Sequence, residues 1–432
     1  MEQDYRSVLD RASWTGIHWT VFSSTALGFF AWGFVYSLSV LVTSWSIVPI
    51  GGIPILLTIS PIFLVTGNFL LGSLADRVGR RPAFMVTVAV YATGIAGVIL
   101  SPNFYTLLLF VAIAQLGVGG EEPTALAALA EFTPVRHRGK AIVLSSNFYN
   151  IGAFVAASLI LYGLSSVPLQ KTVLGIAALL LIGTILFTRR RLPESVRWLV
   201  KRGRVKEAEQ LLGSVRGQVK EVAGFQNVAV ATRPKYSARF AFTILALLGV
   251  SQLTTYGLLA FIIGPYSFSS IAPQIVMVAN AGASVAGFLG AYVVDRLSRR
   301  FFSLFSYLGG LVTVTFVLAA VGVVSSNILV FFVFLFLNMI FSELGWAARV
   351  VLEPELAMGT NLRSTFIALV RVVAWGFFIT SIYLTSSLST FGFVELNVLL
   401  WGLGAMAAFA WFMRGVETRR ESLESITGES YA

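Results

Sequence analysis

Apolar stretches of about 20 residues recur along almost the whole chain, separated by short polar segments. A helix needs about 20 apolar residues to cross the hydrocarbon core of a bilayer. The pattern therefore predicts an all-α membrane protein with twelve transmembrane helices. Their predicted cores are residues 19–45, 52–73, 82–101, 104–131, 140–163, 170–188, 240–263, 273–294, 301–324, 327–352, 364–388 and 394–413.

The longest polar segment divides six predicted helices from six. Within it, Val205, Ala208, Leu211, Leu212 and Val215 recur at the spacing of one helix face, which predicts a short amphipathic helix along the cytoplasmic membrane surface. The predicted parts are a six-helix bundle (1–188), a cytoplasmic linker (189–238), a second six-helix bundle (239–414) and a cytoplasmic tail (415–432).

Composition agrees with a membrane protein. Hydrophobic residues make up 56% of the chain and charged residues only 12%, about half the charged share of a soluble domain. A chain this apolar cannot cover its surface with polar groups, so the lipid bilayer is its expected environment. The absence of cysteine excludes disulfides and thiolate metal sites.

The net charge of +11 comes from basic residues on one side of the predicted helices. The loops of the opposite side hold one basic residue, Lys171. Basic residues in short loops stay in the cytoplasm, so we expect both termini inside the cell and the protein in the cell membrane. The basic excess is thus a signal of topology, and we expect no nucleic-acid partner.

A short charged motif occurs twice, once in each half. GSLADRVGRR (Gly72–Arg81) returns as AYVVDRLSRR (Ala291–Arg300), and Glu122 and Glu343 occupy similar places in the fourth and tenth predicted helices. A repeat of six helices predicts two pseudo-symmetric bundles that face each other across a central cavity, which suits alternating access. The duplication favours a cytoplasmic latch in each half; a tight basic turn that fixes topology is the alternative.

At these residues the chain resembles the major facilitator superfamily. The first copy matches the signature loop of that family between helices two and three, and Pro193–Leu199 (PESVRWL) resembles the PESPRWL motif of sugar porters and organic-ion transporters. The resemblance implies the major facilitator fold and a salt-bridge network that closes the cytoplasmic side. The gate residues that it implies are Asp76, Arg81, Glu131, Arg138, Glu194, Arg300, Glu355 and Arg363, and the repeated motif adds Arg77, Arg80, Asp295 and Arg299.

Ionisable residues inside predicted spans are costly and normally face a cavity or a partner. The sequence GGEEP around Glu121 resembles the GG-acid-x-P of proton-coupled metabolite and phosphate symporters, which favours Glu121 as the proton-coupling acid. The repeat, and the helix face shared with Gln115, favour Glu122 instead. Both therefore stay candidates, with a pair that serves only packing as the alternative.

Two arginines in the second half also fall inside predicted spans. Arg349 and Glu353 are spaced i,i+4, so we expect an intrahelical pair. Arg371 has no local acid and needs Glu343, a helix-four glutamate or an anionic substrate. Residues predicted to contact the substrate are Gln115, Asn147, Asn150, Gln252, Thr255, Tyr256, Glu343, Trp346 and Arg371.

These observations predict a secondary active transporter of a small polar organic solute, a sugar or an organic acid or ion, with proton-coupled symport. The alternative is an uncoupled facilitator or an exporter of organic ions or drugs. The chain contains no HExxH, GxSxG or P-loop pattern, so we expect neither an enzyme nor ATP-driven pumping. We expect no cofactor, no metal site and a monomer.

Overall fold

The predicted spans form long helices whose outer faces are apolar. The structure is a computed structural model, and it describes residues 5–161, 166–216, 236–259, 271–320, 322, 327–385 and 388–428. Within these ranges, twelve helices are long and apolar enough to cross a membrane, which confirms the twelve predicted spans. Part of the predicted linker, residues 217–235, lies outside the described residues.

The first half of the chain forms nine helices within the described residues: a short first helix and six spans, two of which are interrupted. The fourth span breaks at Gly120, just before Pro123, and the fifth breaks at Asn147. The helices are α1 (Tyr5–Arg11), α2 (Gly16–Leu41), α3 (Ile53–Val78), α4 (Arg80–Leu100), α5 (Phe104–Gly119), α6 (Glu121–Phe132), α7 (Arg138–Ser146), α8 (Phe148–Leu161) and α9 (Val167–Arg189).

Two short helices follow the first half, and the second half then repeats the pattern of long helices. The short helices are α10 (Val196–Lys201) and α11 (Val205–Arg216). The later helices are α12 (Ala238–Gly257), α14 (Ala272–Val293), α15 (Arg299–Ala319), α17 (Ile328–Glu355), α18 (Arg363–Thr385), α19 (Thr390–Arg414) and α20 (Leu423–Thr427).

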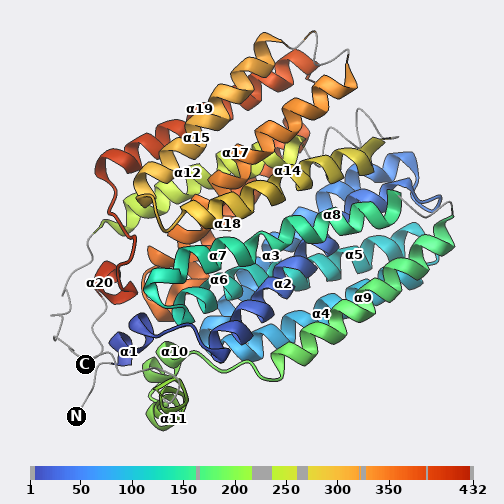
Figure 1. The fold of residues 1–432 in the computed structure, drawn as a ribbon. Helices are drawn as coiled ribbons and strands as arrows, with labels where there is room; N and C mark the ends of the chain where they lie inside the picture. Colours follow the sequence, from blue (N-terminus) through green and yellow to red (C-terminus); the bar gives the residue numbers. More distant parts are fainter. Residues whose placement is uncertain are drawn as a thin grey trace.

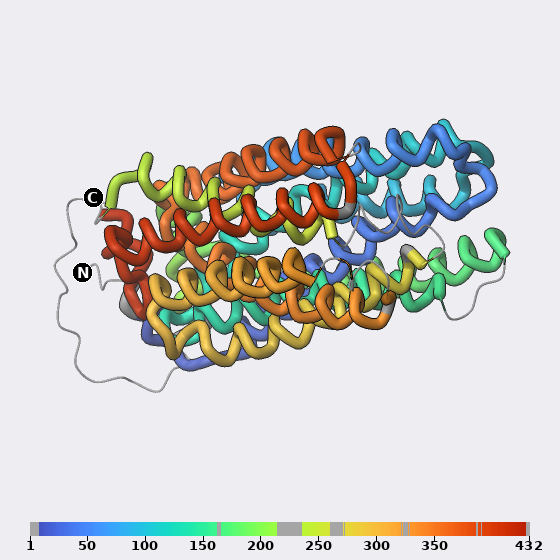
Figure 2. The backbone as a smooth tube through the Cα atoms, turned by 90° about the horizontal axis from the view of Figure 1, so that it is seen from above, coloured from blue at the N-terminus to red at the C-terminus, as the bar shows by residue number. Residues whose placement is uncertain are grey.

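The long helices run side by side, with the two halves of the chain on opposite sides of the molecule (Figure 1). Both ends of the described chain, together with α1, α10, α11 and α20, gather at one end of the helices (Figures 1 and 2). The charged loops of the repeated motif lie at this end as well. We refer to it as the basic end.

Two helix pairs make the most extensive contacts between the halves. Helix α3 packs against α18, and α8 packs against α14. The first pair joins spans two and eleven, and the second joins spans five and eight. In the repeat, span two corresponds to span eight and span eleven to span five, so the two pairs are equivalent. This arrangement agrees with the two-fold repeat that the sequence predicts.

Large apolar side chains point outward along the spans, where a soluble protein would place charges. Leu179 and Leu180 on α9, Phe316 on α15 and Met406 on α19 are all more than 60% exposed. Arginine and glutamate side chains instead lie inside, where other protein groups can pair with them. Apolar side chains thus cover the outside of the spans and charged side chains lie inside, as expected of a protein surrounded by lipid.

The first copy of the repeated motif folds as a one-residue turn. Helix α3 ends at Val78 and α4 begins at Arg80, with Gly79 between them at a φ of 107°. A side chain would strain this backbone and would also overlap the carboxylate of Glu194. The second copy has Ser298 in place of this glycine, and there the turn runs over several residues, with the Ser298 hydroxyl accepting from the Phe301 N–H.

The predicted amphipathic helix forms as α11, but protein covers part of its apolar face. Ala208 and Leu212 are buried in a small cluster with Leu9 of α1 and with Trp198 and Leu199 of α10. The helix therefore packs onto α1 and α10 at the basic end.

Candidate functional site

A cavity lies between the two halves. Five helices contribute its walls: α2 and α8 from the first half, and α12, α17 and α18 from the second. The lining residues are Trp32, Tyr36, Tyr149, Asn150, Gln252, Leu253, Tyr256, Gly257, Glu343, Trp346, Trp375 and Phe378.

Aromatic rings from both halves meet around this cavity. The ring centroids of Trp32 and Trp346 are 5.8 Å apart, and those of Tyr36 and Trp375 are 5.6 Å apart. Within the first half, Trp32 lies 4.5 Å from Tyr149. Gly33 allows this approach, because a Cβ there would overlap the carbonyl oxygen of Tyr149. The two halves are thus in ring-to-ring contact across the cavity.

Three of the described lining residues carry an amide or a carboxyl group: Asn150, Gln252 and Glu343. The Gln252 amide is already engaged, since it accepts from Arg349 at 3.1 Å and donates to the Ser342 hydroxyl at 3.4 Å. Glu343 is 4% exposed, and its Oε1 has no hydrogen-bond partner among the described residues. The cavity thus contains a buried carboxylate with free acceptor capacity.

Five of the nine predicted substrate residues line the cavity: Asn150, Gln252, Tyr256, Glu343 and Trp346. Three of the others make contacts elsewhere. Gln115 donates to the Val35 carbonyl at 3.1 Å, Asn147 donates to the Ser284 carbonyl at 3.0 Å, and the Thr255 hydroxyl donates to the Ser251 carbonyl at 2.9 Å. The ninth, Arg371, is buried beneath Trp346.

The list of predicted substrate residues lacks several aromatic lining residues. Tyr149 directly precedes Asn150, and Trp375 and Phe378 lie four and seven residues after Arg371, on the same helix face. Helical spacing from a buried charge would have pointed to Trp375 and Phe378. Aromatic residues are so common along these spans, however, that periodicity alone does not separate lining from packing positions.

A group of four buried charges lies next to the cavity and joins the halves. Glu122 of α6 pairs with Arg371 of α18, and Arg371 also donates to Glu353 at 2.9 Å. The predicted intrahelical pair forms as well, with Arg349 and Glu353 2.7 Å apart. Arg371 lies 4.5 Å from the ring centroid of Trp346. Two arginines and two glutamates neutralise one another here.

Glu121 points away from this group. Its carboxylate pairs with Arg189 of α9 at 2.5 and 2.9 Å and accepts from the Thr87 hydroxyl of α4. All three residues belong to the first half. Helix α6 begins directly after the interruption at Gly120, and its first two residues, Glu121 and Glu122, face different partners. Neither of them lines the cavity.

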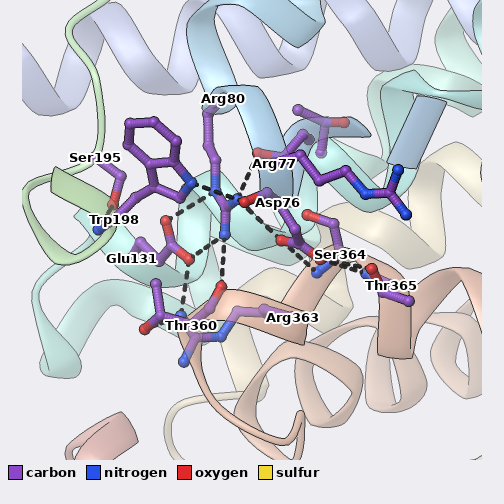
Figure 3. Close-up of polar contacts among 12 residues, drawn as sticks. Asp76, Arg77, Arg80, Glu131, Ser195, Trp198, Thr360, Arg363, Ser364 and Thr365 are labelled. Atoms are coloured by element: carbon purple, nitrogen blue, oxygen red, sulfur yellow. Dashed lines mark hydrogen bonds and ion pairs between the residues drawn. The ribbon is translucent and has the colours of Figure 1, made fainter. Parts of the chain in front are cut away.

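At the basic end, Glu131 is the centre of one charge cluster (Figure 3). It accepts from Arg80 at 2.7 Å and from Arg363 of the other half at 2.9 Å. Arg80 also pairs with Asp76 at 2.9 Å. Asp76 in turn accepts from the backbone N–H and the hydroxyl of Thr365, both at 2.8 Å. A carboxylate from the first half thus caps the N-terminus of α18.

A second cluster repeats this arrangement with the halves exchanged. Glu355 lies 3.5 Å from Arg299 and 3.9 Å from Arg138 of the first half. Arg299 pairs with Asp295 at 2.9 Å, and Asp295 accepts from the backbone N–H of Lys140 near the start of α7 at 2.7 Å. Each half therefore supplies an arginine that pairs with the glutamate of the other half, and an aspartate that caps a helix of the other half.

The remaining predicted gate residues lie around these clusters. Glu194 accepts from the backbone N–H groups of Arg80 at 2.8 Å and Arg81 at 3.2 Å. Arg77 and Arg81 point outward and are exposed. Arg300 donates to the Gly415 carbonyl at 3.4 Å. The contacts of these residues are peripheral to the pairs that cross between the halves.

The C-terminal segment is fastened to the basic end through Arg197 of α10. This buried arginine pairs with Glu424 and with Asp10 of α1, each at 2.8 Å. Burial alone would raise the pKa of Glu424, but the charge of Arg197 and its hydrogen bond outweigh burial and lower the pKa to about 2. This pair therefore joins the linker to the C-terminal segment.

The Arg197–Glu424 pair predicts that docking of this segment withstands moderate acid. The folded pKa of Glu424 is below its ordinary value of 4.5, so the stabilisation is fully present above 4.5 and is lost as pH falls toward 2. We expect the anisotropy of a fluorophore on a cysteine at the exposed Arg420 to stay constant from pH 8 to pH 5. Arg197→Gln should lower this anisotropy over the whole range from pH 8 to pH 5. A fall of the wild-type signal between pH 8 and pH 5 would contradict the assignment.

Comparison with known proteins identifies the family of this chain. The model of a family described as "Sugar (and other) transporter" matches residues 55–429. Over 285 residues the chain is 28% identical to the niacin transporter NiaP of Acinetobacter baylyi, with 61% of this chain and 63% of that protein covered. It is 26% identical over 253 residues to the major myo-inositol transporter IolT of Bacillus subtilis, with 53% of each covered. The chain thus spans between half and two thirds of these relatives.

Solved structures share the fold. The proton:xylose symporter XylE, solved with 6-bromo-6-deoxy-D-glucose, aligns with a TM-score of 0.75 at 14% identity, over 95% of this chain and 98% of that one. The human organic anion transporter MFSD10 aligns with a TM-score of 0.65 at 15% identity, over 91% and 98%. At this level of identity the likeness concerns the arrangement of helices.

Proposed function

The chain belongs to the sugar (and other) transporter family of the major facilitator superfamily, and from this premise we propose that it moves a small polar organic solute across the cell membrane by alternating access. It is a multi-pass membrane protein and not an enzyme. The observation that carries the proposal is a cavity lined by both halves and closed at the basic end by ion pairs between them. One chain supplies the whole cavity, which suits a monomer.

We assign the basic end to the cytoplasm, because basic residues in short loops remain there. The two clusters then act as a cytoplasmic gate. Opening the cavity inward has to separate Arg363 from Glu131 and Arg138 from Glu355. It also has to withdraw Asp76 from the N-terminus of α18. The duplicated motif therefore serves as one latch in each half.

We further propose that transport is coupled to protons and that Glu122 carries the proton. Its ion pair with Arg371 crosses between the halves, whereas Glu121 pairs with Arg189 inside the first half. Protonation of Glu122 removes its attraction to Arg371 and leaves Arg371 with Glu353 in its own half. The proton can thus loosen the contact that must break during the cycle.

Uptake into liposomes tests the coupling. With an imposed pH gradient, acid outside, we expect the wild-type protein to accumulate its solute above equilibrium. Glu122→Gln fixes the site in an uncharged form, so we expect accumulation to fall to the equilibrium level while exchange across the membrane continues. Glu207→Gln, the same change on the exposed surface of α11, is the matched control and should accumulate solute like the wild type.

Two results would contradict proton coupling through Glu122. Accumulation that persists in Glu122→Gln would assign the proton to another group, with Glu121→Gln as the next variant to measure. Wild-type uptake that ignores the gradient would instead support an uncoupled facilitator. That second candidate is favoured by one observation: both glutamates already have arginine partners, as structural ion pairs do.

A further inference from the structure

Among the described residues, the buried charges inside the spans balance except in the cavity. Glu121 is matched by Arg189, and the pair Glu122 and Glu353 is matched by the pair Arg349 and Arg371. Glu343 remains. Among the described residues, no basic nitrogen lies within 4.0 Å of its carboxylate, and its Oε1 accepts no hydrogen bond. When Glu343 is ionised, the cavity therefore holds one negative charge without a counter-ion among the described residues.

The walls around this carboxylate are aromatic. Among the described residues that line the cavity, none is a lysine or an arginine, and seven of the twelve are aromatic. The negative face of an aromatic ring attracts a cation, most strongly for tryptophan and most usefully where water is excluded. These rings are Trp32, Tyr36, Tyr149, Tyr256, Trp346, Trp375 and Phe378.

We propose that the solute of this cavity is a monovalent organic cation, a quaternary or protonated amine, held between the Glu343 carboxylate and the aromatic walls. This inference rests on the proposed transport function and names its substrate class. The cation supplies the missing counter-ion of Glu343, and the rings cover its apolar substituents. An organic cation would thus account for both the carboxylate of Glu343 and the aromatic walls of the cavity.

The same lining suits other solutes less well. A polyhydroxylated sugar needs many hydrogen-bonding partners, but Gln252 is already engaged by Arg349 and Ser342. An anion would meet Glu343 directly. The nearby arginines do not offset this, because Arg349 and Arg371 lie outside the lining and are neutralised by Glu353 and Glu122. Charge and wall chemistry therefore both favour a cation.

Choline and its uncharged isostere 3,3-dimethylbutan-1-ol separate charge from shape. We would measure binding of each to the purified full-length protein by thermal shift and by tryptophan fluorescence, since three tryptophans line the cavity. We expect choline to bind at least about 30-fold more tightly than the alcohol, as a cation does in a desolvated aromatic site. Glu343→Gln should reduce this preference at least about tenfold, and Glu207→Gln should preserve it.

Equal binding of choline and the alcohol by the wild-type protein would overturn the proposal, and this result does not depend on any variant folding. A preference for choline that survives in Glu343→Gln would overturn the role of that carboxylate. Uptake of myo-inositol and of choline into liposomes separates this proposal from the proposed transport function. Inositol uptake without a preference for choline would support the transporter and contradict the cation as its solute, whereas uptake of neither compound would contradict both.

Discussion

Replacing Glu131 by glutamine is expected to open the basic end of the protein. Glu131 is buried and accepts from two buried arginines, Arg80 at 2.7 Å and Arg363 at 2.9 Å. The substitution leaves both guanidinium groups without a carboxylate, and removing one partner of a buried ion pair costs about 3–5 kcal/mol. Because Arg363 comes from the other half, much of this cost falls on the closed form. The equilibrium should therefore shift toward the inward-open form by a factor of the order of 100.

The absence of cysteine makes this shift measurable. Spin labels on cysteines introduced at Val78 and Met358, both exposed near the basic end, report the separation of the halves. We expect Glu131→Gln to add a longer distance to the distribution, and Glu207→Gln to leave it unchanged. An unchanged distribution in a folded Glu131→Gln protein would show that other contacts hold the gate closed.

Replacing Arg371 by methionine is expected to cause the largest loss of stability of any change near the cavity. Arg371 is fully buried, and it is the ion-pair partner of Glu122 among the described residues. Methionine keeps much of the length of the side chain but leaves Glu122 charged and unpaired, at a cost of about 3–5 kcal/mol. Glu353 suffers less, because Arg349 stays 2.7 Å away.

A double-mutant cycle isolates this pair. Removing both charges, with Glu122→Gln and Arg371→Met together, should restore most of the stability lost in the single Arg371→Met variant, because no unpaired carboxylate remains. Thermal unfolding of the wild type and the three variants in the same detergent measures the coupling. Proton-driven accumulation should stay absent in the double variant. If the two substitutions lower stability additively, Glu122 and Arg371 do not act as a pair.

The spans and the repeated motif could be predicted from the sequence because their signals are local. A run of apolar residues identifies a span wherever it packs. Arg349 and Glu353 lie one helical turn apart, so their pair also follows from spacing. Each of these inferences needs only residues of one helix.

The cavity could be predicted only in part. Amides and charges inside spans are rare, so Asn150, Gln252 and Glu343 were visible as candidates. The depth and orientation of these side chains could not be predicted. Asn147 and Gln115 are equally polar, but in the structure they bind the backbone of neighbouring helices. Aromatic lining residues carry no such signal, because the chain has many aromatic residues and most of them pack elsewhere.

By itself, the sequence determined that this is a twelve-span membrane protein with a charged loop repeated in each half, since hydrophobicity and charge order are properties of short segments. Only the tertiary structure decided which charges meet. Glu131 and Arg363 are 232 positions apart, and Arg371 pairs with Glu122 rather than with Glu343. Such pairs depend on how helices from different halves pack and turn, and a buried charge pairs with whichever opposite charge that packing brings within reach.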